Sequence, residues 1–134
     1  MTPEAYVAQL AQRLNAGHYH LIAEGFALPM PIFIGKATAV ANTAEDVWGF
    51  LQGLHALIRA SGHVRVVPRL VSVELPQRNR FRLWTDWTGE GPAGRRRLYR
   101  TICYNTGEIG HHQTEMLRFE ELGWPQLARV ARAA

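Results

Sequence analysis

The apolar pattern of the sequence changes its period once, near His63, and this change constrains the fold more than any other feature. Before His63, apolar residues recur every three to four positions, as in helices that bury one face. After it, apolar and polar residues alternate over four long segments that short turn sequences separate. Strands joined by short connections pair antiparallel. The sequence therefore predicts an α+β fold, with N-terminal helices packed on a curved antiparallel sheet meander.

Local signals give the expected bounds of the elements. A first helix is expected after the N-cap Thr2, a second short helix around Ile22, and the longest helix between the N-cap Thr43 and Ser61. A C-terminal helix is expected after Pro125. The expected strands are 32–34, 64–75, 80–88, 96–104 and 108–119.

Length and composition indicate one ordinary globular domain over residues 1–134. The chain is 47% apolar and 19% charged, and no apolar run reaches the roughly 18 residues that a membrane span needs. Its first residues lack the layout of a secretion signal, so a cytoplasmic location is the default expectation. The single cysteine, Cys103, excludes an internal disulfide framework and is expected to be a packed thiol.

The chain is basic, with a net charge of +4 and all but one of its lysines and arginines being arginine. Much of the excess flanks two turns, at 78–82 and 95–97, where charges usually belong to solvated hairpin ends. No nucleic-acid-binding motif accompanies them, so nucleic acid is not an expected partner. An anion binder that works through these turns is the weakest of three functional hypotheses, and it predicts a steep salt dependence of binding.

The first long hairpin predicts two different sheet faces. Closing it around Gln77 sets Glu74 opposite Arg80. One face is then a core, with Val67, Val71, Val73, Phe81, Leu83 and Trp87, whereas the other carries Leu70 beside Trp84, with Arg82 and Asp86. An exposed apolar pair such as Leu70 and Trp84 indicates a subunit interface, so we expect a homodimer through the sheet.

The last hairpin supplies the candidate site. Closing it over Thr106-Gly107 sets Ile102 opposite His111 and Arg100 opposite Gln113. Polar residues then lie among apolar ones, as in a small-molecule pocket if this face points inward. His111 and Glu115 are the candidate acid–base pair, and Arg100 could hold a carboxylate or enolate oxygen by a forked contact. The expected ligand-binding residues are Arg100, Tyr104, His111, Gln113, Glu115 and Trp87.

One alternative exchanges the two faces of this hairpin, because a register slip of one residue inverts every side chain. Tyr99, Thr101, Cys103, His112, Thr114 and Met116 would then face inward, with His112 replacing His111 as the candidate. Asp86 together with Trp84 is a further candidate for the functional site. The six histidines do not form a spaced set of three ligands, so neither a metal nor a cofactor is expected.

The element order, together with Leu14-Asn15-Ala16-Gly17 followed by Ile22 and Phe26, resembles the nuclear transport factor 2-like superfamily. That group includes ketosteroid isomerases, SnoaL-like polyketide cyclases and scytalone dehydratase. The resemblance implies a conical half-barrel with a deep pocket, and often a homodimer through the sheet. The isomerase chemistry does not carry over, because its tyrosine and catalytic aspartate fall at Leu10 and Ile34, and its second acid falls near Arg100.

Besides the anion binder, two functions stay open at this point. The leading hypothesis is a small-molecule-binding domain with a hydrophobic pocket for an apolar or weakly acidic molecule. If the domain is an enzyme, the resemblance implies a SnoaL-like isomerase, cyclase or dehydratase. The alternative is a non-catalytic protein-interaction domain that uses the outer sheet face.

Overall fold

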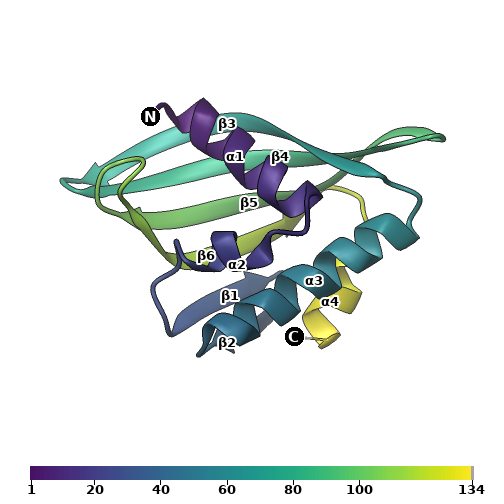
Figure 1. Cartoon of the computed structure of the whole chain (residues 1–134), viewed down its shortest axis with the longest axis horizontal. Coiled ribbons are helices and arrows are strands. Elements are labelled where there is room, and N and C mark those ends of the chain that lie inside the picture. The colour runs from purple at the N-terminus through teal and green to yellow at the C-terminus, as the bar shows by residue number, and fades with distance from the viewer. Residues whose placement is uncertain (134) are drawn as a thin grey trace.

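A computed structural model describes the backbone of residues 1–133 and the side chains of residues 1–130. Its helices cover one face of a curved six-stranded sheet, which confirms the α+β prediction (Figure 1). The helices are α1 (Pro3–Asn15), α2 (Tyr19–Ala23), α3 (Ala44–Ala60) and α4 (Leu127–Ala133). The strands are β1 (Met30–Ile34), β2 (Ala37–Ala41), β3 (Arg65–Gln77), β4 (Arg80–Gly91), β5 (Gly94–Thr106) and β6 (Gln113–Glu121).

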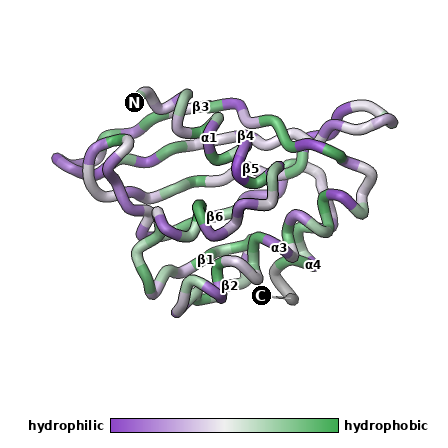
Figure 2. Tube along the Cα trace, viewed as in Figure 1, coloured by the Kyte–Doolittle hydropathy of each residue, from purple (hydrophilic) through white to green (hydrophobic). Residues whose placement is uncertain are grey.

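The sheet has the order β2-β1-β6-β5-β4-β3, so β3 to β6 form the predicted antiparallel meander. β1 pairs parallel with β6, and Ile32 lies opposite Leu117. The sequence did not predict β2, a short strand of small residues that pairs with β1. Figure 2 shows hydrophobic residues along β1 and the side of α3 that faces it, where part of the core lies. No helix within residues 1–133 is both long and apolar enough to cross a membrane.

Side-chain caps start the two long helices where the sequence predicts. The Thr2 hydroxyl accepts a hydrogen bond from the Ala5 amide at 3.1 Å. At α3, the Thr43 hydroxyl accepts from the Asp46 amide, and the Asp46 carboxylate accepts from the Asn42 and Thr43 amides. These backbone donors lower the pKa of Asp46, and the reciprocal pair is a capping box.

Asn15 attaches the end of α1 to the start of β3. Its Nδ2 donates to the Val66 carbonyl at 3.0 Å, and its Oδ1 accepts from the Val66 amide at 2.8 Å. The side-chain amide thus pairs with one residue of the edge strand as a neighbouring strand would. Asn15 in the Leu-Asn-Ala-Gly motif therefore has a structural role, because it fixes the angle at which α1 crosses the sheet.

The first long hairpin has a different register from the predicted one. Glu74 lies opposite Arg82 rather than Arg80, and a bulge at Val71 separates the Leu70–Thr85 pair from the Ser72–Trp84 pair. Because a bulge shifts the alternation by one residue, Leu70 faces the core and Trp84 faces outward. The predicted Leu70–Trp84 pair is therefore wrong. Val67 also points outward and Val66 takes its core position, while Val71 and Val73 are 42% and 38% exposed.

The last hairpin also departs from the prediction, because its connection spans residues 107–112 instead of a two-residue turn. Ile102 lies opposite Arg118 rather than His111, and Arg100 lies opposite Glu120 rather than Gln113. A bulge at Glu115 changes the alternation once more. The inward face of β5 and β6 carries Tyr99, Thr101, Cys103, Thr114, Leu117 and Phe119, whereas Arg100, Ile102, Tyr104 and Met116 point outward.

Candidate functional site

Arg100 and Tyr104 lie on the outer face of the sheet, outside the cone. Arg100 donates from Nε to Oδ1 of Asp86 at 2.6 Å and from one terminal nitrogen to Oδ2 at 3.2 Å. The Arg82 guanidinium lies over the Tyr104 ring, 5.1 Å from its centroid. Neither side chain reaches the interior, so the predicted pocket around them does not form.

The other predicted polar residues are spread along the rim. His111 is an exposed residue of the 107–112 loop, and Gln113 is exposed where β6 begins. Glu115 is the bulge residue, and its carboxylate lies 3.9 Å from the Arg80 guanidinium at the surface. The structure therefore does not bring His111 and Glu115 together as an acid–base pair, since the sequence-based register that joined them is wrong.

Trp87 is the one predicted ligand-binding residue that faces the interior. Its side chain is buried, and its Nε1 donates to the Thr101 hydroxyl at 2.8 Å. It borders a small cavity of about 60 Å³ inside the cone. Binding sites for small molecules usually measure about 300–1,000 Å³, so the cone is nearly filled by its own side chains. The cavity is lined by Tyr6, Leu10, Leu14, Ile22, Phe26, Leu51, Leu54, Trp87, Tyr99, Thr101, Cys103, Leu117 and Phe119.

None of these lining side chains is charged at neutral pH. Burial raises the pKa of the Cys103 thiol to about 12, and it raises the pKa values of Tyr6 and Tyr99 above their ordinary range. A thiol and two phenols in this state can donate hydrogen bonds but do not exchange protons readily near neutral pH. The side chains that line this cavity therefore offer packing surface and a few hydrogen bonds.

His112, the alternative candidate, is the last residue of the loop before β6. Its ring packs edge-on against Tyr6 and Phe81, with centroids 4.4 and 4.9 Å away. Burial lowers the pKa of this imidazole. The ring is wedged between two aromatic side chains and does not line the cavity, so its surroundings are those of a packing residue.

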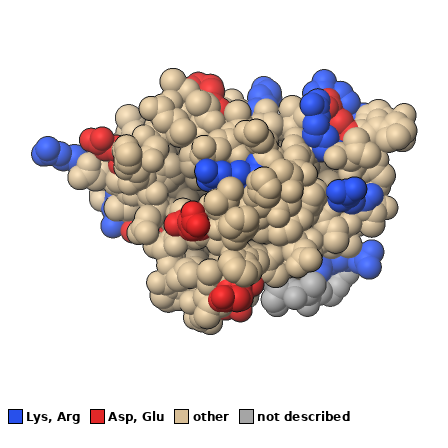
Figure 3. All heavy atoms as spheres, in the orientation of Figure 1, with Lys and Arg blue, Asp and Glu red and all other residues tan. Residues whose placement is uncertain are grey.

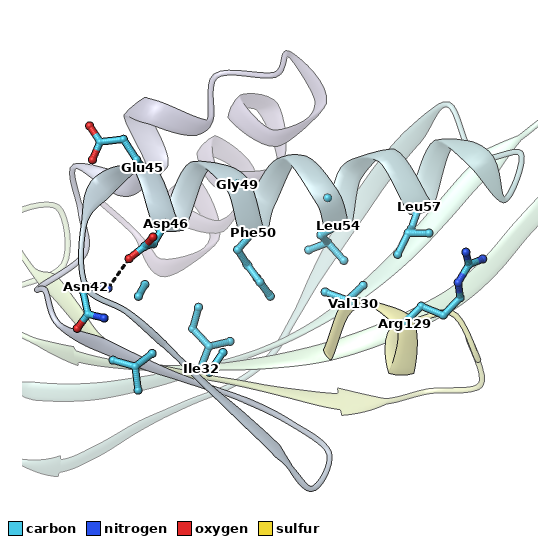
Figure 4. Close-up of a pocket in the computed structure, with 14 residues that line it drawn as sticks. Ile32, Asn42, Glu45, Asp46, Gly49, Phe50, Leu54, Leu57, Arg129 and Val130 are labelled. Atoms are coloured by element: carbon cyan, nitrogen blue, oxygen red, sulfur yellow. Dashed lines mark hydrogen bonds between the residues drawn. The ribbon is translucent and has the colours of Figure 1, made fainter. Parts of the chain in front are cut away.

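A second hollow, of about 740 Å³, lies between α3, the β1–β2 hairpin and α4 (Figure 4). Phe50, Leu54 and Leu57 point from α3 toward Ile32 of β1, and Val130 of α4 lies at one end. We call this hollow the α3 groove. Its lining residues are Ile32, Ala39, Val40, Ala41, Asn42, Glu45, Asp46, Gly49, Phe50, Gly53, Leu54, Leu57, Arg129 and Val130.

Two glycines of α3 widen the groove. A Cβ atom at Gly49 or Gly53 would meet no atom within 4 Å. Each glycine inside a helix costs about 1 kcal/mol relative to alanine, and no close packing within the described residues requires it. Gly49 and Gly53 are the signal in the sequence that could have indicated this site, because two glycines four residues apart interrupt an otherwise strong helix.

The two ends of the groove differ in charge. Asp46 lies at the start of α3, where its carboxylate accepts hydrogen bonds from the backbone amides of the helix cap. Arg129 lies at the opposite end and forms no ion pair with any residue in the described part of the chain. Glu45 also lines the groove, next to Asp46. The groove thus combines an apolar floor with one cation at one end.

Leu54 separates the groove from the cone. It is 1% exposed, and it borders both the 740 Å³ groove and the 60 Å³ interior cavity. Next to it, Phe50 of the groove packs edge-on against Phe119 of the cone, with 5.5 Å between the ring centroids. One layer of side chains therefore divides the two hollows.

Solved structures share this architecture at low sequence identity. A cystatin-like domain of unknown function from Nostoc punctiforme is 12% identical, with a TM-score of 0.67 over 96% of this chain and 80% of that one. A Catenulispora acidiphila protein in complex with S-DNPA is 12% identical, with a TM-score of 0.63 over 88% and 89%. A protein named Rd1NTF2_04 with a long sheet is 13% identical, with a TM-score of 0.63 over 88% and 99%. No protein-family model and no curated protein matches the chain.

Proposed function

The chain has a nuclear transport factor 2-like fold, and we propose that it binds an elongated apolar carboxylate in the α3 groove. The observation that carries this proposal is the groove volume of about 740 Å³, next to a cone interior of only about 60 Å³. The first volume lies within the range of small-molecule sites and the second lies well below it. A ligand of ordinary size therefore fits the groove without a rearrangement of the core.

The chemistry of the groove selects the ligand class. Ile32, Phe50, Leu54 and Leu57 offer an apolar surface, and each buried methylene group of a ligand contributes about 0.8 kcal/mol. Arg129 can hold a carboxylate by a forked contact at one end. Asp46 at the other end disfavours an anion there, so the ligand has one preferred orientation.

Two further observations support binding without catalysis. A neighbour of the same fold has been solved in complex with S-DNPA, so this architecture is compatible with a bound compound. The cone, where ketosteroid isomerases hold their acid–base groups, is lined in this chain by uncharged side chains. We therefore propose a carrier or sensor of the ligand rather than an isomerase, cyclase or dehydratase.

The test compares decanoic acid with decanol, which has the same chain length without the charge, by thermal shift and calorimetry. A ligand at about 100 times its dissociation constant stabilises the folded state by about 2.7 kcal/mol. Gly53→Leu fills the groove and should abolish binding of both compounds. Arg129→Ala should weaken the binding of decanoic acid and leave the binding of decanol unchanged.

Lys36→Ala, in the turn between β1 and β2, is the matched control, because it removes a cation that does not line the groove. It should bind the acid as the parent does. Undiminished binding of decanoic acid to Gly53→Leu would place the ligand elsewhere and refute the groove as the site.

A second candidate function is self-association through the outer sheet face. Ile102 is only 2% exposed although it points away from the core, and Trp84 lies opposite it. Trp84 Nε1 is buried without an acceptor among the described residues. On the same face, the Arg118 guanidinium lies 5.0 Å from the Phe33 ring centroid. Aromatic residues and arginine are enriched in interface cores, so a second copy of the chain is the partner we propose.

A further inference from the structure

Three arginines from two strands converge on one carboxylate of the outer sheet face. Asp86 lies in the middle, on β4, and its side chain is 6% exposed. Its Oδ2 atom lies 3.2 Å from a terminal nitrogen of Arg100, 3.4 Å from one of Arg69 and 3.5 Å from one of Arg97. We call these four residues the Asp86 cluster.

The carboxylate cannot satisfy all three guanidinium groups. A carboxylate oxygen accepts about two good hydrogen bonds, and Oδ2 has three potential donors. Arg100 has the best geometry, because it also donates from Nε to Oδ1 at 2.6 Å, and this contact is the main reason for the lowered pKa of Asp86. Arg69 and Arg97 have only the two longest contacts, and their side chains are 75% and 61% exposed. Most of their N–H groups therefore face solvent.

Another arginine pair nearby shows what full pairing looks like. Glu90 receives Arg65 on Oε1 at 2.6 Å and Arg95 on Oε2 at 2.8 Å, so each guanidinium has its own oxygen. Positively and negatively charged side chains also lie next to one another at the upper right of Figure 3. The Asp86 cluster has three cations for one carboxylate. Glu120, which lies opposite Arg100 on β6, offsets part of this excess on the far side from Arg69.

We propose that Arg69 and Arg97 form a binding site for a phosphate group. Arg69, which is on β3, lies directly opposite Asp86 of β4. Arg97, which is on β5, lies opposite Thr88 of β4, so the two arginines flank β4 on its outer face. A tetrahedral dianion between them would receive forked contacts from both guanidiniums, and the Thr88 hydroxyl lies on the same face. The Asp86 carboxylate is covered by the arginines and holds them in place. This site is separate from the α3 groove and does not depend on it.

The test is a titration of the full chain with inorganic phosphate, followed through the Nε–Hε signals of the arginine side chains by NMR. Ionic strength is held constant with sodium chloride. Saturable shifts of the Arg69 and Arg97 signals are expected. Arg69→Gln and Arg97→Gln should each weaken binding about tenfold or more, since a hydrogen bond to a charged group is worth roughly 1.5–3 kcal/mol.

Phenyl phosphate, titrated in the same way, separates the two sources of this group. Shifts with both compounds identify a site that accepts the phosphoryl group of a larger molecule. Shifts with inorganic phosphate alone identify a site for the free anion. Both results support the proposal.

Arg95→Gln is the control, because this arginine is paired with Glu90. The variant should bind phosphate as the parent does. Two results would overturn the proposal: shifts that chloride reproduces, or unchanged binding by the double variant of Arg69 and Arg97. Both replaced side chains are largely exposed, so the variants should fold, and their amide spectra verify this.

Discussion

Single residues set distances between whole elements in this protein. Asn15 fastens α1 to the edge strand through two hydrogen bonds to Val66. Gly91 allows the turn after α3 to touch β4, since a Cβ atom there would lie 2.1 Å from the Gly62 carbonyl oxygen. Gly89 does the same for the His63 ring, which a Cβ atom would approach to 2.6 Å. Each contact couples a helix end to the sheet, so the cone tolerates little change at these positions.

Two histidines, the buried His55 and the half-buried His112, should give the protein a pH-dependent stability. Burial lowers the pKa of His112, and it lowers that of His55, whose Nδ1 lies 2.5 Å from the Tyr19 hydroxyl. Below the ordinary histidine pKa of about 6.5, the unfolded chain therefore binds protons more readily than the folded one. The free energy of unfolding should fall as the pH drops below this value, until the lowered folded-state pKa values are passed. Urea denaturation at a series of pH values measures the fall.

His112→Gln removes one of these groups and should reduce the slope of stability against pH. His111→Gln, at the exposed neighbouring position, is measured beside it as a comparison. An unaltered slope in His112→Gln would contradict the assignment. Carboxylates such as Asp86 contribute to the pH dependence of stability over a separate and more acidic pH range. The pKa of Asp86 is lowered mainly by its hydrogen bond to Arg100.

At the scale of elements, α3 has a well-capped N-terminus and two glycines of low helix propensity in its middle. Its capping box joins Thr43 and Asp46, and its apolar side packs on the core through Val47, Leu51 and Leu54. Gly49 and Gly53 are exposed, do not belong to that side, and line the groove. The helix therefore gives up intrinsic stability at the site where we propose that a ligand lies.

Gly53→Ala should raise the free energy of unfolding by about 1 kcal/mol, because alanine favours the helix and its Cβ meets no neighbour. Thermal denaturation measures the change. Gly91→Ala is the matched contrast, and it should destabilise the fold by about 1–3 kcal/mol through the clash with Gly62. A destabilised Gly53→Ala would mean that the helix side of the groove is packed rather than open.

The edge strand β3 is protected against pairing with other chains. Pro68 and Pro76 lack amide donors, and bulges interrupt the strand after Leu70 and after Glu74. Prolines and bulges are common devices that keep edge strands from recruiting further strands. Association through this edge is therefore disfavoured, although Val71, Val73 and Leu75 are exposed on it.

At the scale of the whole molecule, the sheet has one face under the helices and one face open. The open face carries the Trp84–Ile102 pair in the centre and charged rows on both sides, among them Arg69, Asp86, Arg100 and Glu120 opposite one another across four strands. The apolar centre is where we propose that two copies of the chain meet.

Trp84→Glu should convert the proposed homodimer into a monomer, because it places a charge at the centre of the interface. Sedimentation velocity at several protein concentrations measures the state of the parent and of the variant. Trp48→Glu is the control, since Trp48 is 39% exposed on α3, away from the sheet. A parent protein that sediments as a monomer at all concentrations would refute the dimer.

Local chemistry determined the element types in this chain. Helix caps such as Thr2 and Thr43 act within four residues, and the alternation of the long strands is visible along each strand, so both can be recognised from neighbouring letters. The same reasoning predicted the α+β class and the order of the meander. It missed β2, whose small residues carry little pattern.

Only the tertiary structure decided which side chains meet. Bulges at Val71 and Glu115 and the long loop at 107–112 each change the alternation of inward and outward side chains. For this reason Arg100 and Tyr104 point outward, and His111 and Glu115 lie apart at the rim. The α3 groove and the Asp86 cluster join residues far apart in sequence, and no local signal places such residues together. The sequence thus determined the elements, whereas long-range packing determined the sites, because one inserted residue moves every later side chain of a strand to the other face.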